Sequence, residues 1–316
     1  MIAFPRIFST SMLLACGALS LPFSALAQDE KATHPKKPFL WKVEGNGLEK
    51  PSYLFGTIHI STPEIRDLHP TAAKAFDSAE TLYTEIPLDP KTQLEMTPRL
   101  MRKDGTTLSA SIGEEITKDL DAELARINPA LNSQPFQSFE TWGVTMILPI
   151  LKYSMAGEKA IDARLWERAT EQKKKTDALE TAESQFAILG NLTEEQNKIM
   201  LAETLKQLKE DRAVGRDSVR NLVDAYIAGD EKMVVDEFER SAKLLAESEH
   251  KELGEMFMKR LLTDRDLSLA ATIDERLQEF PDKIQFFAVG VGHLAGEAGI
   301  CSHLTKKGYR ITRIKD

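Results

Sequence analysis

Apolar runs that lead into a glycine and then a histidine occur near both ends of the chain. The run YLFGTIHI (residues 53–60) contains a glycine followed, three positions later, by His59. The run IQFFAVGVGH (residues 284–293) repeats this arrangement and ends at His293. Short apolar runs rich in β-branched and aromatic residues are typical of buried strands. We therefore predict two strands that each present a histidine just past the carboxyl end, where open α/β sheets build their sites.

The same pattern predicts strands at residues 39–43, 52–55 (the strand that leads to His59), 81–86 and 309–314. A Gly-Asn-Gly turn separates the first two, and this predicts a hairpin. Glu85 lies near the end of the third. A carboxylate is therefore expected at the same sheet edge as His59.

The middle of the chain, from Asp89 to Arg260, has the spacing of helices. Apolar residues recur there at i, i+3 and i+4, and Pro, Gly and Ser are too few to mark a linker. Residues 141–151 are apolar almost throughout, so we predict a helix buried against the sheet. A short strand is expected at residues 178–181. Outside this region, helices are predicted at residues 70–79, 265–280 and 294–306.

These elements together predict an α/β or α+β fold. The central sheet is built from both chain ends, and a helical insertion at about 89–260 packs on it. Residues 28–316 are long enough for a sizeable core and are expected to form a single domain.

Residues 1–27 have the features of an export signal. Arg6 is the only charged residue, an apolar stretch follows, and Ala25-Leu26-Ala27 is a small-x-small cleavage pattern. We expect cleavage after Ala27, a periplasmic or secreted location, and no transmembrane span in the mature chain. The alternative is a lipoprotein anchored through Cys16, because residues 13–17 loosely resemble a lipobox.

Composition excludes several classes of protein. The net charge is −8 and no basic stripe is present, which argues against a nucleic-acid partner. Cys301 is the only cysteine after the leader, so no internal disulfide is expected. The chain lacks a Gly-x-Ser-x-Gly elbow, and its glycine spacing does not match a dinucleotide-binding fingerprint.

Two histidines and a carboxylate at one sheet edge suggest a metal site. Neutral imidazole is the commonest metal ligand, and a neighbouring carboxylate suits Mn²⁺, Co²⁺ or Zn²⁺. We therefore predict that His59, His293 and Glu85 bind a divalent metal. The alternative is that both histidines are structural residues, hydrogen-bonded at strand ends.

The order and spacing of several motifs resemble the TraB/GumN family. In this sequence the motifs are LWKV (40–43), YLFGTIH (53–59), TE (84–85), LET (179–181), residues 222–230 and VGVGHLAGE (289–297). They extend over nearly the whole chain after the leader, and the last is quite specific. The resemblance implies kinship with the Tiki metalloproteases and, more remotely, with erythromycin esterases and ChaN-like proteins.

The resemblance also implies which residues act. Tiki-type proteases use two Gly-x-x-His histidines, a glutamate and an arginine with a divalent metal. For this chain we expect Mn²⁺ or Co²⁺, with Zn²⁺ as the alternative. The matching residues here are His59, His293, Glu85 and Arg265, with Glu180 and Glu297 as competing carboxylates.

Roles for two of these residues follow from their chemistry. A glutamate that is not a ligand would serve as general base. Arg265 would stabilise an oxyanion or bind a substrate carboxylate. Alternatively, Arg265 pairs only with the adjacent Asp264 or Asp266.

The leading functional hypothesis is an exported, metal-dependent hydrolase of peptide type. One alternative is a non-enzymatic periplasmic protein that captures a peptide or signalling molecule in the same cleft. Another is an ester or lactone hydrolase, as in the remoter kin. The substrate is accordingly expected to be a peptide or another small molecule.

Overall fold

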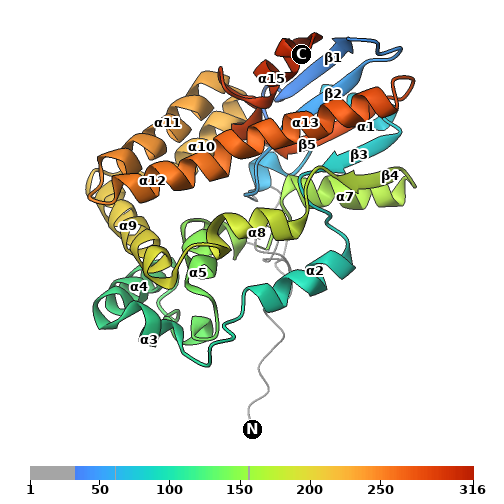
Figure 1. Cartoon of the computed structure of the whole chain (residues 1–316). Coiled ribbons are helices and arrows are strands. Elements are labelled where there is room, and N and C mark those ends of the chain that lie inside the picture. The colour runs from blue at the N-terminus through green and yellow to red at the C-terminus, as the bar shows by residue number, and fades with distance from the viewer. Residues whose placement is uncertain (1–32, 61, 156) are drawn as a thin grey trace, which may run out of the picture.

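One six-stranded mixed sheet forms the centre of the computed structural model (Figure 1). The structure describes residues 33–60, 62–155 and 157–316, so the predicted export signal and Cys16 lie outside the described residues. The strands, in the sheet order β4-β3-β5-β2-β1-β6, are β1 (Leu40–Gly45), β2 (Ser52–Thr57), β3 (Thr81–Thr84), β4 (Lys175–Ala178), β5 (Gln285–Gly290) and β6 (Tyr309–Ile314).

Four neighbouring strands of the sheet run parallel. β4, β3, β5 and β2 are paired in parallel, while β1 is antiparallel to both β2 and β6. The predicted hairpin is present, with Leu40 opposite Phe55. Because parallel strands end at the same edge, four successive carboxyl ends meet there. The predicted α/β class and the contribution of both chain ends to the sheet are confirmed.

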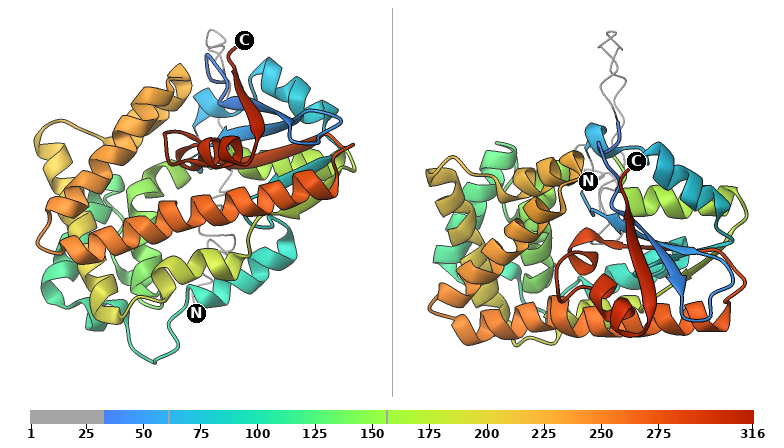
Figure 2. Two further views of the ribbon diagram at one scale, coloured as in Figure 1. Left: turned by 45° about the horizontal axis from the view of Figure 1, so that its top comes forward. Right: turned by 90° about the horizontal axis from the view of Figure 1, so that it is seen from above.

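Helices cover both faces of the sheet (Figures 1 and 2). Alternating side chains divide between the two faces. Phe286 packs with α1 (Pro70–Ser78) and α7 (Ile161–Glu171), whereas Phe287 packs with α10 (Ser218–Ala228), α13 (Asp264–Glu279) and α15 (Ile300–Lys306). The fold therefore has three layers, with the sheet in the middle.

A second hydrophobic core lies among helices away from the sheet, at the lower left of Figure 1. Its helices include α3 (Leu108–Ile112), α4 (Glu114–Ile127), α5 (Thr141–Ile147), α9 (Glu194–Ala213) and α12 (Lys251–Met258). The remaining α-helices are α2 (Pro90–Met96), α6 (Leu151–Ser154), α8 (Ala182–Gly190), α11 (Glu231–Glu247) and α14 (Val291–Leu294), and a π-helical turn spans Lys259–Thr263.

The predicted helix at residues 141–151 is buried, but its partner was predicted wrongly. Trp142, Val144 and Ile147 belong to the second core, and α5 packs on α9 rather than on the sheet. The segment is also interrupted, because a 3₁₀ turn at Leu148–Ile150 contains Pro149. Apolar composition indicated burial, but it carried no information about which surface would cover the helix.

Two other predicted elements differ in their bounds. The strand in the middle of the chain is Lys175–Ala178 rather than 178–181, because a polar edge strand lacks the apolar pattern that would mark its bounds. The helix predicted at 294–306 is two helices, α14 and α15. Gly296 between them has φ +84°, a conformation that interrupts a helix and that glycine adopts without strain.

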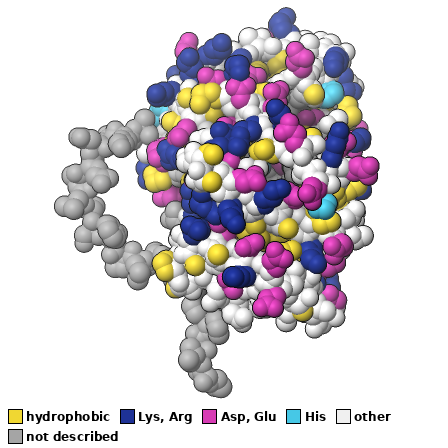
Figure 3. Space-filling view, turned by 90° about the vertical axis from the view of Figure 1, so that its left-hand side faces the viewer, with side chains coloured by type: hydrophobic (Ala, Val, Ile, Leu, Met, Phe, Trp, Pro, Cys, Tyr) yellow, Lys and Arg dark blue, Asp and Glu magenta, His cyan; other side chains and the backbone are white. Residues whose placement is uncertain are grey.

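Figure 3 shows Lys and Arg side chains interspersed with Asp and Glu over the face that it views. Along α11, Lys232 pairs with Asp236 and Lys243 pairs with Glu247, both at i, i+4 spacing. Within the described part of the chain, no helix combines the length and apolar character that a membrane crossing requires.

Candidate functional site

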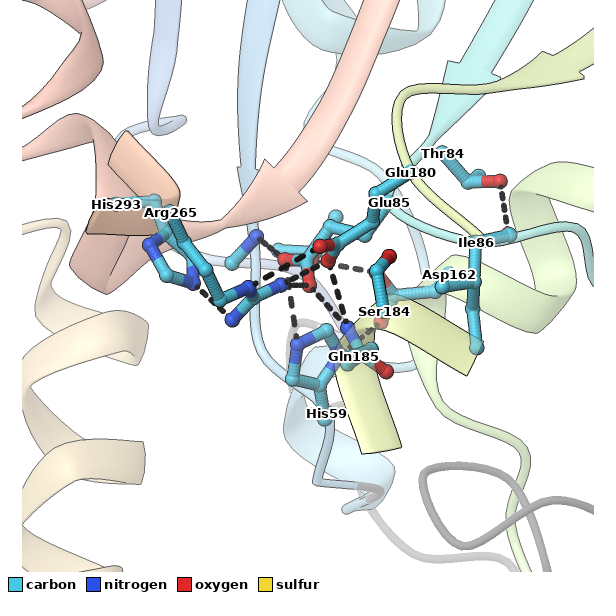
Figure 4. A network of polar contacts seen from close by, with 12 residues as sticks. His59, Thr84, Glu85, Ile86, Asp162, Glu180, Ser184, Gln185, Arg265 and His293 are labelled. Carbon is cyan, nitrogen blue, oxygen red and sulfur yellow. Dashed lines mark hydrogen bonds and ion pairs between the residues drawn. The ribbon is translucent and has the colours of Figure 1, made fainter. Parts of the chain in front are cut away.

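Most of the sequence-predicted residues meet at the carboxyl edge of the four parallel strands (Figure 4). His59 follows β2, Glu85 follows β3, Glu180 follows β4, and His293 lies on α14 directly after β5. The Nε2 atom of His59 is 3.6 Å from Glu85 Oε1. Side chains distant in the sequence therefore converge because their strands are neighbours in the sheet.

Gly290 marks the point where the two imidazoles and the carboxylate converge. A Cβ atom added at Gly290 would lie 3.1 Å from Glu85 Oε1, 3.3 Å from His59 Nε2 and 3.5 Å from His293 Cδ2. The amide of Gly290 also donates a hydrogen bond of 2.6 Å to Glu85 Oε1. The missing side chain thus leaves room between the three groups.

Gly56, the glycine of the other Gly-x-x-His motif, allows close packing in the core. A Cβ atom there would meet Phe39 Cβ at 2.9 Å and Val291 side-chain atoms at 3.1 Å. Its carbonyl oxygen accepts a hydrogen bond of 2.7 Å from the buried hydroxyl of Tyr226. The two motifs have the same spacing, but one glycine serves packing and the other borders the site.

Each histidine is oriented by a buried aspartate. Nδ1 of His59 donates to Asp162 Oδ2 at 3.1 Å, and Thr57 donates to the other oxygen of Asp162 at 2.6 Å. Nδ1 of His293 donates to Asp266 Oδ1 at 2.6 Å. Both histidines therefore present Nε2 to the site, with the ring orientation and tautomer fixed by the aspartate.

Arg265 connects the carboxylates to His293. It is 8% exposed, and its guanidinium donates to Glu85 Oε2 at 2.6 Å, to Glu180, and to His293 Nε2 at 2.9 Å. The alternative that Arg265 pairs with its neighbours in sequence was wrong. Asp264 instead bonds Lys259, and Asp266 bonds His293.

The electrostatic environment favours opposite charges on His59 and Glu85. Burial opposes ionisation of both, but Asp162 and Glu85 outweigh it and hold the pKa of His59 well above its ordinary value. The hydrogen bond and charge of His59, with the charge of Arg265, hold the pKa of Glu85 well below its ordinary value despite burial. Burial raises the pKa of Glu180 and that of Asp266.

The cluster lies on the wall of a cavity of about 290 Å³. His59, Glu85, Gln185, Arg265 and His293 supply its polar groups. Most of the remaining lining is apolar and includes Trp142, Met146, Phe186, Phe238, Leu261 and Leu262. Sites that combine an apolar wall with a few convergent polar groups are typical of ligand binding.

The donor types match a divalent metal, but their arrangement in this structure does not. Nε2 of His293 has one lone pair, and the guanidinium of Arg265 occupies it. Among the residues that the structure describes, no three His, Cys, Asp or Glu side chains are grouped to hold a metal ion. Metal binding by His59, His293 and Glu85 therefore stays a prediction.

Sequence reasoning missed three residues of the cluster. Asp162 and Asp266 orient the histidines, and Gln185 of α8 donates to Glu85 at 3.0 Å and to Glu180 at 3.1 Å. A sequence pattern existed for Asp162, which is an acidic residue beside Ile161 on the buried side of α7. In contrast, Glu297 is exposed in the turn after α14 and is not among the residues that line the cavity.

The pKa shifts of His59 and Glu85 predict how stability depends on pH. The raised pKa of His59 contributes stability that is complete below pH 6.5 and is lost as pH rises through the folded-state pKa. The lowered pKa of Glu85 contributes stability that is present above pH 4.5 and is lost as pH falls through its folded-state pKa. Both contributions are complete between about pH 4.5 and 6.5.

We therefore expect the free energy of unfolding to decrease from pH 6.5 to 9, and His59→Gln to remove part of this decrease. Urea unfolding of both proteins in the presence of a chelator measures the difference at each pH. Parallel curves for the two proteins over this range would contradict the assigned charge of His59.

The chain belongs to the TraB/PrgY/gumN family, which it matches over residues 39–313. Several named proteins are similar in sequence to this chain. The chain is 26% identical to Metalloprotease TIKI1 of Xenopus tropicalis and 25% identical to Metalloprotease TIKI1 of Homo sapiens. These alignments cover 97% and 96% of this chain and 68% of each relative.

Metalloprotease TIKI2 of Danio rerio is 24% identical, with 86% of this chain and 60% of that protein aligned. No solved structure matches the chain. The names of these relatives state that they are metalloproteases, without indicating which metal they use.

Proposed function

We propose that this protein is an exported hydrolase that cleaves peptide bonds at the cluster of His59, Glu85, Arg265 and His293. The observation that carries the proposal is their convergence beside Gly290 at the wall of an otherwise apolar cavity. Relatives named metalloproteases support a peptide substrate. Dependence on a divalent metal, with Mn²⁺ or Co²⁺ preferred to Zn²⁺, stays a prediction.

Peptide hydrolysis needs a group that transfers protons and a group that stabilises the developing oxyanion. His59 suits proton transfer, because Asp162 holds its Nδ1 and its Nε2 faces Glu85 Oε1 at the cavity wall, 3.6 Å away. Arg265 suits the second role, because its guanidinium is fixed by two carboxylates and lines the same cavity. His293 holds Arg265 from the other side.

The apolar wall favours a substrate with a hydrophobic side chain near the scissile bond. Trp142, Phe186 and Phe238 lie on the wall together with the polar cluster. A cavity of about 290 Å³ is at the small end of ligand pockets, and such a volume suits a short segment better than a folded protein.

The test is a digest of a peptide mixture by the purified protein, analysed by mass spectrometry with added Mn²⁺, Co²⁺ or Zn²⁺. We expect His59→Ala to lower the cleavage rate on the order of 10²–10⁴-fold, the usual contribution of a proton-transfer residue. His293→Ala should have a similar effect, and the double variant should be little worse, because groups that act as a unit are not additive.

His250→Ala is the matched control, because His250 is exposed and lies outside the cluster. It should leave the rate unchanged. Stoichiometric peptide binding without cleavage would favour the binding-protein alternative, and turnover of esters or lactones alone would favour the esterase alternative. Cleavage that survives both histidine substitutions would exclude this site.

Export is part of the proposal and rests on residues 1–27, with Cys16 as the alternative anchor. The intact mass of the exported protein checks this assignment. A chain beginning at Gln28 would support it, and acylation of Cys16 would replace it with the lipoprotein alternative.

A further inference from the structure

The guanidinium of Arg265 contacts two of the three side chains predicted to bind a metal. It contacts Nε2 of His293 at 2.9 Å and Oε2 of Glu85 at 2.6 Å, and these residues are two of the three predicted ligands. It also contacts Glu180 through two nitrogen atoms. A planar fork with several donors can satisfy such a set of acceptors at once.

His293 cannot serve Arg265 and a metal together. Its Nδ1 proton is donated to Asp266, so Nε2 carries the single lone pair of the ring. That lone pair accepts the hydrogen bond from Arg265. A metal ligated by the same nitrogen would have to displace the guanidinium.

The charges around the cluster also indicate that Arg265 and a metal cannot occupy the centre together. Glu85 is buried, Glu180 is partly buried with 12% of its side chain exposed, and the positive charge of Arg265 compensates both. A divalent cation beside the buried guanidinium would place three positive charges within a few ångströms, in a medium where charges interact more strongly than in water. A cation that replaced the guanidinium would instead meet the same two carboxylates.

The position of Arg265 at the start of α13 is well defined by its neighbours in the chain. Arg265 and Asp266 are consecutive residues at the start of α13, and together they hold both ring nitrogens of His293. Directly before them is the π-helical turn Lys259–Thr263, whose Leu261 and Leu262 line the cavity. Single π-helical turns within helices often lie at functional sites.

We propose that Arg265 and a divalent metal are alternative occupants of this centre. The described arrangement is the guanidinium-filled state, and a metal binds only when Arg265 releases His293, while Asp266 keeps the imidazole in place. This inference deepens the proposed function and rests on the same site, but it concerns binding, so it stands or falls independently of any peptide cleavage.

The test is calorimetric titration of the chelator-treated, full-length protein with Mn²⁺, Co²⁺ and Zn²⁺, each used alone. We expect Arg265→Gln to bind at least tenfold more tightly than the wild type for one or more of these ions. The double variant Arg265→Gln/His293→Ala should lose this gain, because the freed lone pair is then absent.

Arg276→Gln is the matched control, since Arg276 lies on the same helix and pairs with the exposed Glu279. It removes the same charge and should leave metal affinity unchanged. Should Arg265→Gln fail to fold, Arg265→Lys keeps the charge without the fork and is expected to show a smaller gain, again dependent on His293.

Equal or weaker metal binding by the folded Arg265 variants would overturn the proposal, as would the absence of metal binding in every protein. A gain that survives His293→Ala would also overturn it, because the metal would then be bound elsewhere. Failure of the wild type to cleave peptides would count against the proposed function alone.

Discussion

Replacing Gly290 by alanine should lower the rate of hydrolysis while the protein stays folded. The added methyl would lie between Glu85 Oε1, His59 Nε2 and His293 Cδ2, at 3.1 to 3.5 Å from each. Because φ of Gly290 is −51°, alanine is compatible with the backbone. We expect the cleavage rate to fall by up to about 10²-fold, because a misplacement of about 1 Å in a catalytic site costs that much and the methyl forces a smaller shift.

Gly56→Ala is the informative comparison. Its methyl would meet Phe39 Cβ at 2.9 Å in the core, so we expect overpacking to cost about 1–3 kcal/mol of stability. The residual activity of folded Gly56→Ala should exceed that of Gly290→Ala. Urea unfolding and the peptide digest measure the two effects separately. Full activity in Gly290→Ala would show that the reaction does not take place at this point of convergence.

Trp142→Ala should destabilise the protein by about 3–5 kcal/mol, the usual cost of a large truncation in a core. Trp142 is 7% exposed, belongs to the core formed by the helices around α5 and α9, and packs against Phe186 with ring centroids 5.4 Å apart. Equilibrium unfolding in urea, followed by circular dichroism, measures the loss.

Leu94→Ala provides the control for this experiment, because Leu94 is 69% exposed and its truncation should cost less than about 0.5 kcal/mol. A loss for Trp142→Ala as small as that of the control would show that α5 is a loosely held cover over the cavity. In that case peptide binding would change far more than stability.

Sequence reasoning located the sheet edge that carries the site. The apolar runs before Gly56 and Gly290 are strand-forming, and a histidine three positions after a strand-ending glycine must lie near the carboxyl end of that strand. The same logic placed Glu85 near the end of the strand predicted at 81–86, and in the structure it directly follows β3. These inferences are local, because they depend only on the direction of a strand and the distance along the chain.

The hydrogen-bond and ion-pair partners of the site residues were determined by the tertiary structure. Asp162 and Asp266 contact histidines 103 and 27 residues away, and no spacing along the chain relates them. Arg265 had acidic neighbours in sequence, yet it contacts Glu85 and Glu180 because α13 passes the carboxyl ends of β3 and β4. Helix packing likewise decided which element covers α5, because the hydrophobic effect is non-directional and any apolar surface can bury the apolar face of a helix.

The chain by itself thus determined which side chains reach one edge of the sheet, because strand direction and side-chain alternation are properties of a few adjacent residues. The tertiary structure alone decided how those side chains pair. Hydrogen bonds and ion pairs depend on distances of a few ångströms between segments far apart in sequence. Such distances are set by the packing of whole helices and strands, and this packing placed the guanidinium of Arg265 on the nitrogen of His293 that the sequence had suggested for a metal.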